Sequence, residues 1–294
     1  MARPAKIEVQ AINLRIDEEK RDYQALVSAL QNIRRGVRVH GDSHLAINYY
    51  DQESNIGVIS KYTEIEIDGE WFDLQTFDVA NEFALDELNI PEHLRPNLSQ
   101  YWFTLVPELH LFVFSSYSES KSLSANLVSR YFEGALNWNE IVEQFGYVES
   151  DIVQSYDEVE KILALDSLVE IDLLIRQPNP DEMDEGLAKE IKERIKQQKA
   201  DELREILRSK TRNRIEPNER TKKLGALAAE NGRLKARAIE NGVMRDYDTT
   251  ETPLHVAETY GPEESERTVF RRLVDELGGM VSSARAKLKD NEEA

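Results

Sequence analysis

Apolar and polar residues alternate along much of the first half of the chain, which predicts β-strands. In Lys6–Ile16 apolar residues occupy every second position and the phase shifts once, so we expect a strand with a bulge. The other alternating segments are 45–50, 56–60, 63–67, 71–77, 101–106 and 110–115. Asp68-Gly69 lies between two of them and is typical of a two-residue hairpin turn, whose residues need positive φ.

Apolar residues spaced three and four apart predict helices at 17–33, 122–136 and 157–164. The clearest helix is C-terminal, with an apolar stripe formed by Val269, Phe270, Leu273, Val274, Leu277, Val281, Ala284 and Leu288. Gly278-Gly279 lies inside this helix and predicts a kink or a close helix contact.

The second half begins with a segment dense in Leu, Ile and Val, Leu168–Ile175, which predicts a strand buried on both faces. Asn179-Pro180 then forms a good helix start. A narrow apolar stripe predicts that this helix continues to about Ser209. The stripe consists of Leu187, Ile191, Ile195, Leu203, Ile206 and Leu207. Pro217 ends any continuation, and a second helix is expected at 219–240, followed by short strands at 243–247 and 253–259.

This order of elements predicts an α+β fold with two sheet-containing halves covered by helices. The expected domains are residues 1–145, rich in antiparallel hairpins, and residues 146–294. The second domain would contain a long helical hairpin at 181–240 and the C-terminal amphipathic helix.

Composition indicates a globular protein of the cytoplasm. The 294 residues are 40% hydrophobic and 32% charged, with no cysteine, and neither a signal peptide nor a membrane-spanning run is visible. The net charge of −19 argues against wholesale wrapping of nucleic acid. The charge is uneven, however: residues 1–150 contain 12 basic and 24 acidic side chains, and residues 186–237 contain 16 basic and 8 acidic ones.

Catalytic motifs are absent, which favours a non-enzymatic protein without a cofactor. The sequence has no GxSxG, Walker, GxGxxG or HExxH motif. One metal site is conceivable, because His40, Asp42 and His44 alternate and would share one side of an extended segment. The alternative is a polar turn that happens to contain two histidines. If a metal were bound, a metal-dependent nuclease would be a third functional class.

A basic run carries the main functional hypothesis. It consists of Arg208, Lys210, Arg212, Arg214, Arg220, Lys222, Lys223, Arg233, Lys235 and Arg237. At a turn between helices such a cluster would bind phosphates through the nucleic-acid backbone, with little sequence specificity. No aromatic residues interleave with it, so base stacking is unsupported. The alternative is that the run pairs with acidic residues of the same chain or of a partner subunit.

Several phrases resemble those of a known protein family. They are Asp68-Gly69-Glu70-Trp71-Phe72, Ile90-Pro91 with Arg95-Pro96-Asn97, and Arg176-Gln177-Pro178-Asn179-Pro180-Asp181. In these the chain resembles an uncharacterised family of bacterial proteins associated with mobile elements and phage defence. The order of elements is also similar to that of the phage lambda exclusion protein A. That second resemblance implies DNA binding.

The leading hypothesis is therefore a non-enzymatic, homo-oligomeric protein of phage defence or exclusion that binds a DNA or RNA backbone. The alternative is an acidic oligomeric scaffold or sensor that binds a protein partner, such as a phage or defence-system protein. The two hypotheses differ in where the side chains of the basic run point. If acidic residues of the same oligomer neutralise these side chains, the scaffold is favoured.

Overall fold

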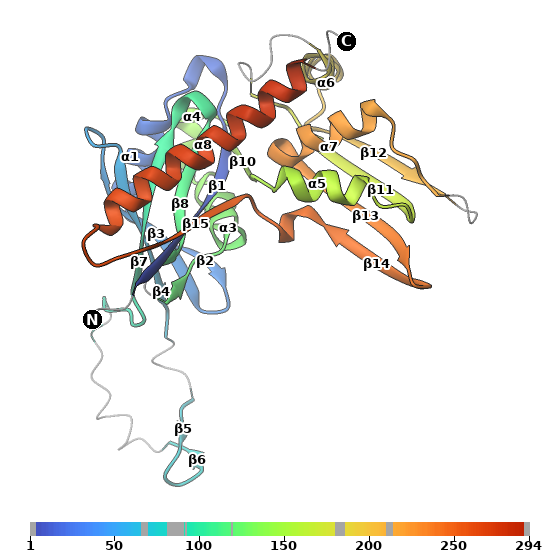
Figure 1. Cartoon of the computed structure of the whole chain (residues 1–294). Helices are drawn as coiled ribbons and strands as arrows, with labels where there is room; N and C mark the ends of the chain where they lie inside the picture. The colour runs from blue at the N-terminus through green and yellow to red at the C-terminus, as the bar shows by residue number, and fades with distance from the viewer. Residues whose placement is uncertain are drawn as a thin grey trace.

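The computed structural model describes residues 4–65, 70–80, 91, 93–118, 120–179, 186–209 and 214–290, and shows a mixed α/β fold (Figure 1). The strands in these ranges are β1 (Ala5–Arg15), β2 (Val37–His40), β3 (Ser43–Asp51), β4 (Ile56–Thr63), β5 (Phe72–Asp73), β6 (Asp78–Val79), β7 (Ser99–Val106), β8 (Leu111–Ser118), β9 (Lys121–Ser122), β10 (Glu149–Ile152), β11 (Leu168–Arg176), β12 (Glu202–Arg208), β13 (Gly232–Glu240), β14 (Val243–Asp248) and β15 (His255–Tyr260). The α-helices are α1 (Tyr23–Ile33), α3 (Ala125–Ala135), α4 (Asn139–Phe145), α5 (Tyr156–Leu163), α6 (Leu187–Gln198), α7 (Glu219–Asn231) and α8 (Glu266–Asp290).

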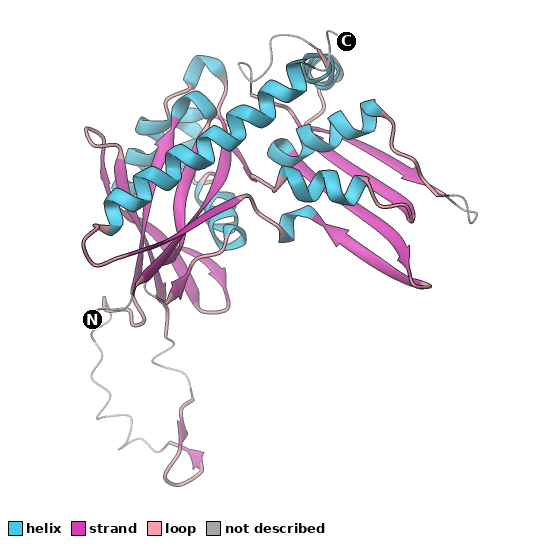
Figure 2. Ribbon diagram, viewed as in Figure 1, coloured by secondary structure: helices cyan, strands magenta, loops and turns pink. Residues whose placement is uncertain are grey.

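Nine strands of the described chain form one antiparallel sheet that curls strongly (Figure 2). Its main path is β10-β1-β8-β7-β4-β3-β2, while β15 pairs with β1 and β9 pairs with β8. The two halves of the sequence meet on β1, whose first part pairs with β15 and whose last part pairs with β10. The large sheet therefore takes strands from both sides of position 146.

β1 is a strand as predicted, and its two faces explain the shift in its apolar pattern. Ile7 and Val9 point to the core under α8, whereas Ile12 and Leu14 point to the core under α1 and α3. The strand is thus buried on one face in its first part and on both faces in its last part. The one register shift against β8 lies between Glu8 and Val9.

Helices cover both faces of the large sheet. Helices α1, α3 and α4 share one apolar core with it, and α8 packs on the other face. The prediction that the first helix begins at Asp17 is wrong. A 3-10 turn occupies Glu18–Lys20, and α1 begins at Tyr23 because Asp22 caps it, its carboxylate accepting a bond from the Ala25 N–H at 2.8 Å.

Strands β12-β11-β13-β14, in that order, form a second antiparallel sheet, hereafter the small sheet. Helices α5, α6 and α7 pack on one of its faces around a separate apolar core. Its register places Ile171 opposite both Leu207 of β12 and Ala236 of β13. The side chains of β11 that face the helices, Ile171, Leu173 and Ile175, are buried in this core. The prediction that both faces of β11 lie in an apolar core is wrong, because Glu170 and Asp172 are on the face that these helices leave uncovered.

The predicted helical hairpin at 181–240 is wrong, because each of its arms changes from helix to strand. The first helix, α6, ends at Gln198, where Lys199 adopts the left-handed conformation with φ 51°. Residues Glu202–Arg208 then form β12. Leu203 and Leu207 are four apart, a spacing that puts two side chains on one face of a helix and equally on one face of a strand. The proposed helix start at Asn179-Pro180 extends into residues outside the described part.

The second arm changes at Gly232, where α7 passes directly into β13. A Cβ at Gly232 would lie 2.0 Å from the carbonyl oxygen of Leu174. Only glycine allows the chain to approach β11 this closely and so to leave the helix for the sheet.

α8 spans Glu266–Asp290 and buries Val269, Phe270, Leu273 and Leu277 in the core that it shares with β1. A Cβ on Gly278 would lie 3.4 Å from Leu109 of the 3-10 turn Pro107–Leu109, an ordinary contact distance, so this contact does not require glycine. No helix in the described residues has both the length and the apolar character that crossing a membrane requires.

β5 and β6 form a small hairpin on its own, which Figure 1 draws apart from both sheets. The strand predicted at 71–77 is limited to Phe72–Asp73, and Asp68-Gly69 lies outside the described residues. The 70–80 arm, as we call this segment, exposes large apolar side chains.

Candidate functional site

The predicted basic run does not form one surface. The face of the small sheet that the helices leave uncovered carries Arg208, Arg233, Lys235 and Arg237. Helix α7, on the opposite face, carries Arg220, Lys222 and Lys223. Arg214 is exposed in the segment before α7, and Lys210 and Arg212 lie outside the described residues. Alternation along β13 causes this separation, because Leu234 and Ala236 point to the helices and the cations between them point away.

Over most of its length, the uncovered side of the small sheet has charges whose sign alternates from strand to strand; at one end the order is reversed, with Glu202 of β12 opposite Arg176 of β11. We call it the charged face; it is formed by Arg204 and Arg208 of β12, Glu170 and Asp172 of β11, Arg233, Lys235 and Arg237 of β13, and Asp246 and Asp248 of β14. Each acidic position is next to a basic strand, and cross-strand neighbours of opposite charge attract one another.

One row of the charged face shows the pairing most completely. The register places Arg208, Glu170, Arg237 and Asp246 directly side by side. Arg208 donates to the Glu170 carboxylate at 3.0 Å, and Arg237 donates through Nε to Asp246 at 2.7 Å. Arg237 also lies 3.8 Å from Glu170. Four charges thus form one continuous chain across four strands.

The next row consists of Ile206, Asp172, Lys235 and Asp248, and its Asp172 is paired diagonally. Arg204, two residues along β12 from Ile206, donates through Nε to Asp172 at 2.7 Å and makes a second bond to the other carboxylate oxygen. This bonding holds the pKa of Asp172 below its ordinary value, with further help from the charge of Arg233. Lys235 lies 2.7 Å from Asp248. Burial raises the pKa of Asp248, but the bonds from Lys235 and Thr250 outweigh it and lower the pKa overall.

Two cations on α7 have partners as well. Arg220 donates to both oxygens of Glu190 on α6, at 3.0 and 2.8 Å, and this raises its pKa. Lys222 lies 2.7 Å from Glu219. The predicted phosphate-binding residues of the described chain are therefore mostly engaged with carboxylates of the same chain.

The proposed metal ligands do not converge. His40 and His44 lie on the hairpin β2–β3, where His44 Nε2 is 3.1 Å from Glu64 and its ring stacks on Tyr62. Asp42 pairs with Arg38 at 3.2 Å. Across the ranges given above, no group of three His, Asp or Glu side chains is placed to hold a metal ion.

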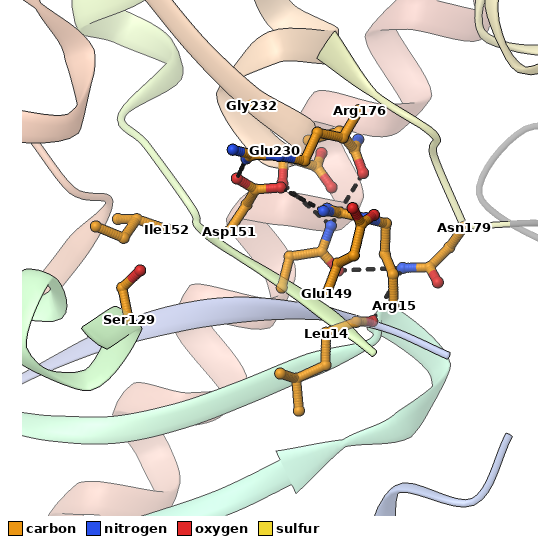
Figure 3. Close-up of polar contacts among 12 residues, drawn as sticks. Leu14, Arg15, Ser129, Glu149, Asp151, Ile152, Arg176, Asn179, Glu230 and Gly232 are labelled. Carbon is orange, nitrogen blue, oxygen red and sulfur yellow. Dashed lines mark hydrogen bonds and ion pairs between the residues drawn. The ribbon is translucent and has the colours of Figure 1, made fainter. Parts of the chain in front are cut away.

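A buried polar junction between the two sheets is the feature that sequence reasoning missed (Figure 3). Arg15 at the end of β1 lies between Asp151, at 2.6 Å, and Glu149, at 3.2 Å. Asp151 also bonds Arg176 of β11, and Asn179 donates to the Leu14 carbonyl at 3.2 Å. Burial lowers the pKa of Arg15, but the two carboxylates outweigh burial and raise it.

The junction continues toward α8. Arg285 donates to Glu230, the buried penultimate residue of α7, at 2.6 Å, and Tyr156 donates to the same carboxylate at 2.5 Å. Arg15, Asp151, Glu230 and Arg285 are all less than a tenth exposed. The only sequence signal is a polar residue inside an apolar strand, as at Arg15, and it does not indicate the partner.

The sequence comparison gives a family and no function. The model of a family described as a domain of unknown function, DUF4747, matches residues 5–275. Among curated proteins, none matches the chain. The matched range includes both sheets and the first part of α8, so the fold described above is that of the family's domain.

Proposed function

We propose that this protein, which belongs to the DUF4747 family, is a non-enzymatic scaffold or sensor that binds a protein partner. One observation carries the proposal: Arg208, Lys235 and Arg237 each lie within ion-pair distance of a carboxylate on a neighbouring strand. Neutralisation within the chain is the result that favours a scaffold over a nucleic-acid-binding protein.

Paired cations make a poor phosphate site. Affinity for nucleic acid comes largely from counterions that the phosphates release when free Lys and Arg replace them. On the charged face a phosphate that approaches Arg237 also approaches Asp246 and Glu170, whose negative charges repel it. The chain's net charge of −19 adds long-range repulsion.

The 70–80 arm supports a protein partner. Leu74 is 80% exposed and Phe77 is 79% exposed, while Phe72 and Val79 are more than half exposed. Clusters of large, exposed apolar side chains commonly mark an interaction site. Strands of two residues cannot stabilise a hairpin alone in water, so we expect the arm to be stabilised by a partner.

Nucleic-acid binding is the second candidate function. Arg214 is exposed. DNA binding is also what the resemblance to the exclusion protein, based on the element order predicted from the sequence, implies. If the protein binds nucleic acid, the carboxylates that pair with the basic run move away, and the released cations contact the phosphate backbone. If the protein is a scaffold, these ion pairs stay intact.

The setting we propose is phage defence, from the family resemblance, with a phage or defence-system protein as partner and self-association as a homo-oligomer. Expression of the chain in a phage-sensitive host is expected to lower plaque counts. Unchanged plaque counts across a diverse phage panel would remove this setting while leaving the binding proposal to its own test.

Partner capture tests the proposed function. The tagged chain is purified from the organism that encodes it, as wild type, as Phe72→Ser/Phe77→Ser, and as the control Val243→Ser. Val243 is 62% exposed at the tip of β13–β14, away from the arm. We expect a protein that the wild type and the control retain and the arm variant loses. Equal capture by all three, or co-purification of nucleic acid alone, would overturn the proposal.

A further inference from the structure

A groove of about 790 Å³ runs between three helices on the covered side of the small sheet. Its walls come from α5, α7 and α8, which Figure 1 shows meeting at the junction of the two sheets. The charged face lies on the other side of the small sheet, so the groove is a separate surface.

The floor of the groove is apolar. Val159 and Leu163 of α5 form its base, and Ala226 of α7 and Ala284 of α8 line it. Met280 of α8 is 39% exposed there, although Met side chains are often fully buried in folded proteins. Met is flexible and adapts to apolar partners, which makes it common on binding surfaces.

Gly279 gives the groove an open wall. A Cβ built on Gly279 has no heavy atom within 4 Å, and the residue is exposed in the middle of α8. Its neighbour Gly278, in contrast, lies against Leu109. Space for a bulky side chain therefore exists above Gly279, and the chain itself leaves it unfilled.

The rim of the groove is acidic. It carries Asp157 and Glu160 of α5, Glu219 of α7 and Glu276 of α8, against Lys222 and Lys223 of α7. Lys222 and Glu219 neutralise each other at 2.7 Å, so three carboxylates, Asp157, Glu160 and Glu276, remain against Lys223. A ligand that enters the groove thus meets an apolar floor between predominantly negative edges.

We propose that this groove binds an amphipathic helix of a partner protein, with Lys and Arg residues on both sides of the helix's apolar stripe. This inference rests on the proposed function and gives the partner a chemistry. An apolar stripe at i, i+3, i+4 and i+7 fits a groove between helices, and basic flanks complement the acidic rim. The net charge of −19 attracts such a segment at long range.

A second copy of the chain does not supply this helix. The described helices with a strong apolar stripe, such as α3 and α8, already bury that stripe in their own cores. The acidic rim would also repel most of the chain's own surface. The occupant is therefore a segment of another protein.

The test uses a defined probe, an 18-residue fluorescent peptide of Leu and Lys with Leu at the i, i+3, i+4, i+7 spacing. A peptide of equal charge with Gln in place of Leu is the charge-only control. Binding to the full chain is followed by anisotropy at low and at moderate salt. We expect the Leu–Lys peptide to bind and the Gln–Lys peptide to bind at least about tenfold more weakly.

Two substitutions on one helix locate the site. Gly279→Phe fills the open wall, and Ser282→Phe places the same side chain on an exposed part of α8 outside the groove. Both keep the net charge. We expect Gly279→Phe to weaken peptide binding at least about tenfold and Ser282→Phe to leave it unchanged. Circular dichroism establishes that both variants are folded.

A charge variant keeps the inference falsifiable if Gly279→Phe does not fold. Glu160→Lys/Glu276→Lys reverses two exposed rim charges and is expected to weaken binding, most clearly at low salt. Equal affinity of the wild type and the groove variants, or equal binding of both peptides, would overturn the groove. Partner capture that depends on the 70–80 arm would still hold in that case, so loss of the groove and loss of the proposed function give different results.

Discussion

Arg237 of β13 donates through Nε to Asp246 of β14 at 2.7 Å, directly across two paired strands. Both side chains are more than half exposed, so solvent screens the pair and it stabilises the fold by little. Its importance is in what the guanidinium can still bind. A cation held by a neighbouring carboxylate offers a phosphate less than a free one does, and such pairs involve all four strands of the small sheet.

The buried junction is expected to dominate stability. Arg15→Met removes the partner of Asp151 and leaves a carboxylate buried beside Arg176 alone. We predict a loss of about 3 kcal/mol in the free energy of unfolding, measured by urea denaturation. The double variant Arg15→Met/Asp151→Leu should recover part of this loss, because no single charge then stays buried. A change below about 1 kcal/mol in the single variant would show that the junction is solvated.

Two glycine substitutions are predicted to act in opposite directions. Gly279→Ala adds a methyl group to an exposed helical position with open space, and should raise the free energy of unfolding by about 0.5–1 kcal/mol. Gly232→Ala would place a Cβ 2.0 Å from the Leu174 carbonyl oxygen and should lower the free energy of unfolding by about 2 kcal/mol or more. Thermal and urea unfolding of both variants check this, and a neutral Gly232→Ala would contradict the close approach of β13 to β11.

The pair of Asp172 and Arg204 predicts a pH dependence. Hydrogen bonds from Arg204, with smaller charge effects, lower the pKa of Asp172 in the folded state. A carboxyl group with a lowered folded pKa contributes stability above its unfolded pKa of about 3.9, and loses it as the pH falls through the folded value. The difference in free energy of unfolding between wild type and Asp172→Asn should therefore be full at pH 6 and shrink below about pH 4. A difference that stays constant down to pH 3 would contradict the prediction.

The sequence predicts most strands of the large sheet and the stripe of α8, because alternation and helical spacing there extend over many residues. It fails at residues 202–208 because Leu203 and Leu207 suit a strand and a helix equally. It fails at β13 because the reason for leaving the helix, the approach of Gly232 to Leu174, is a contact across 58 positions of the chain. The sequence shows that the basic residues are concentrated in this part of the chain. It does not show that they are divided between two sides of the small sheet, because that division depends on β13 being a strand.

The buried junction lies beyond sequence reasoning for a related reason. Arg15 meets Asp151 and Asp151 meets Arg176 only after β1, β10 and β11 come together from distant parts of the chain. Polar residues such as Asn13 and Arg15 in an apolar strand show that a buried partner is needed. They do not show which residue supplies it.

The central claim is that the cations predicted to bind phosphate form ion pairs with carboxylates of the charged face. The most direct test is a titration of wild type and of Glu170→Gln/Asp246→Asn against short duplex DNA, single-stranded DNA and RNA at two salt concentrations. These two carboxylates contact Arg208 and Arg237. We predict no salt-sensitive binding by the wild type, and binding by the variant that weakens as salt rises. Tight, steeply salt-dependent binding by the wild type, lost on reversal of Arg208 and Arg237 to Glu, would contradict the account and establish nucleic-acid binding in its place.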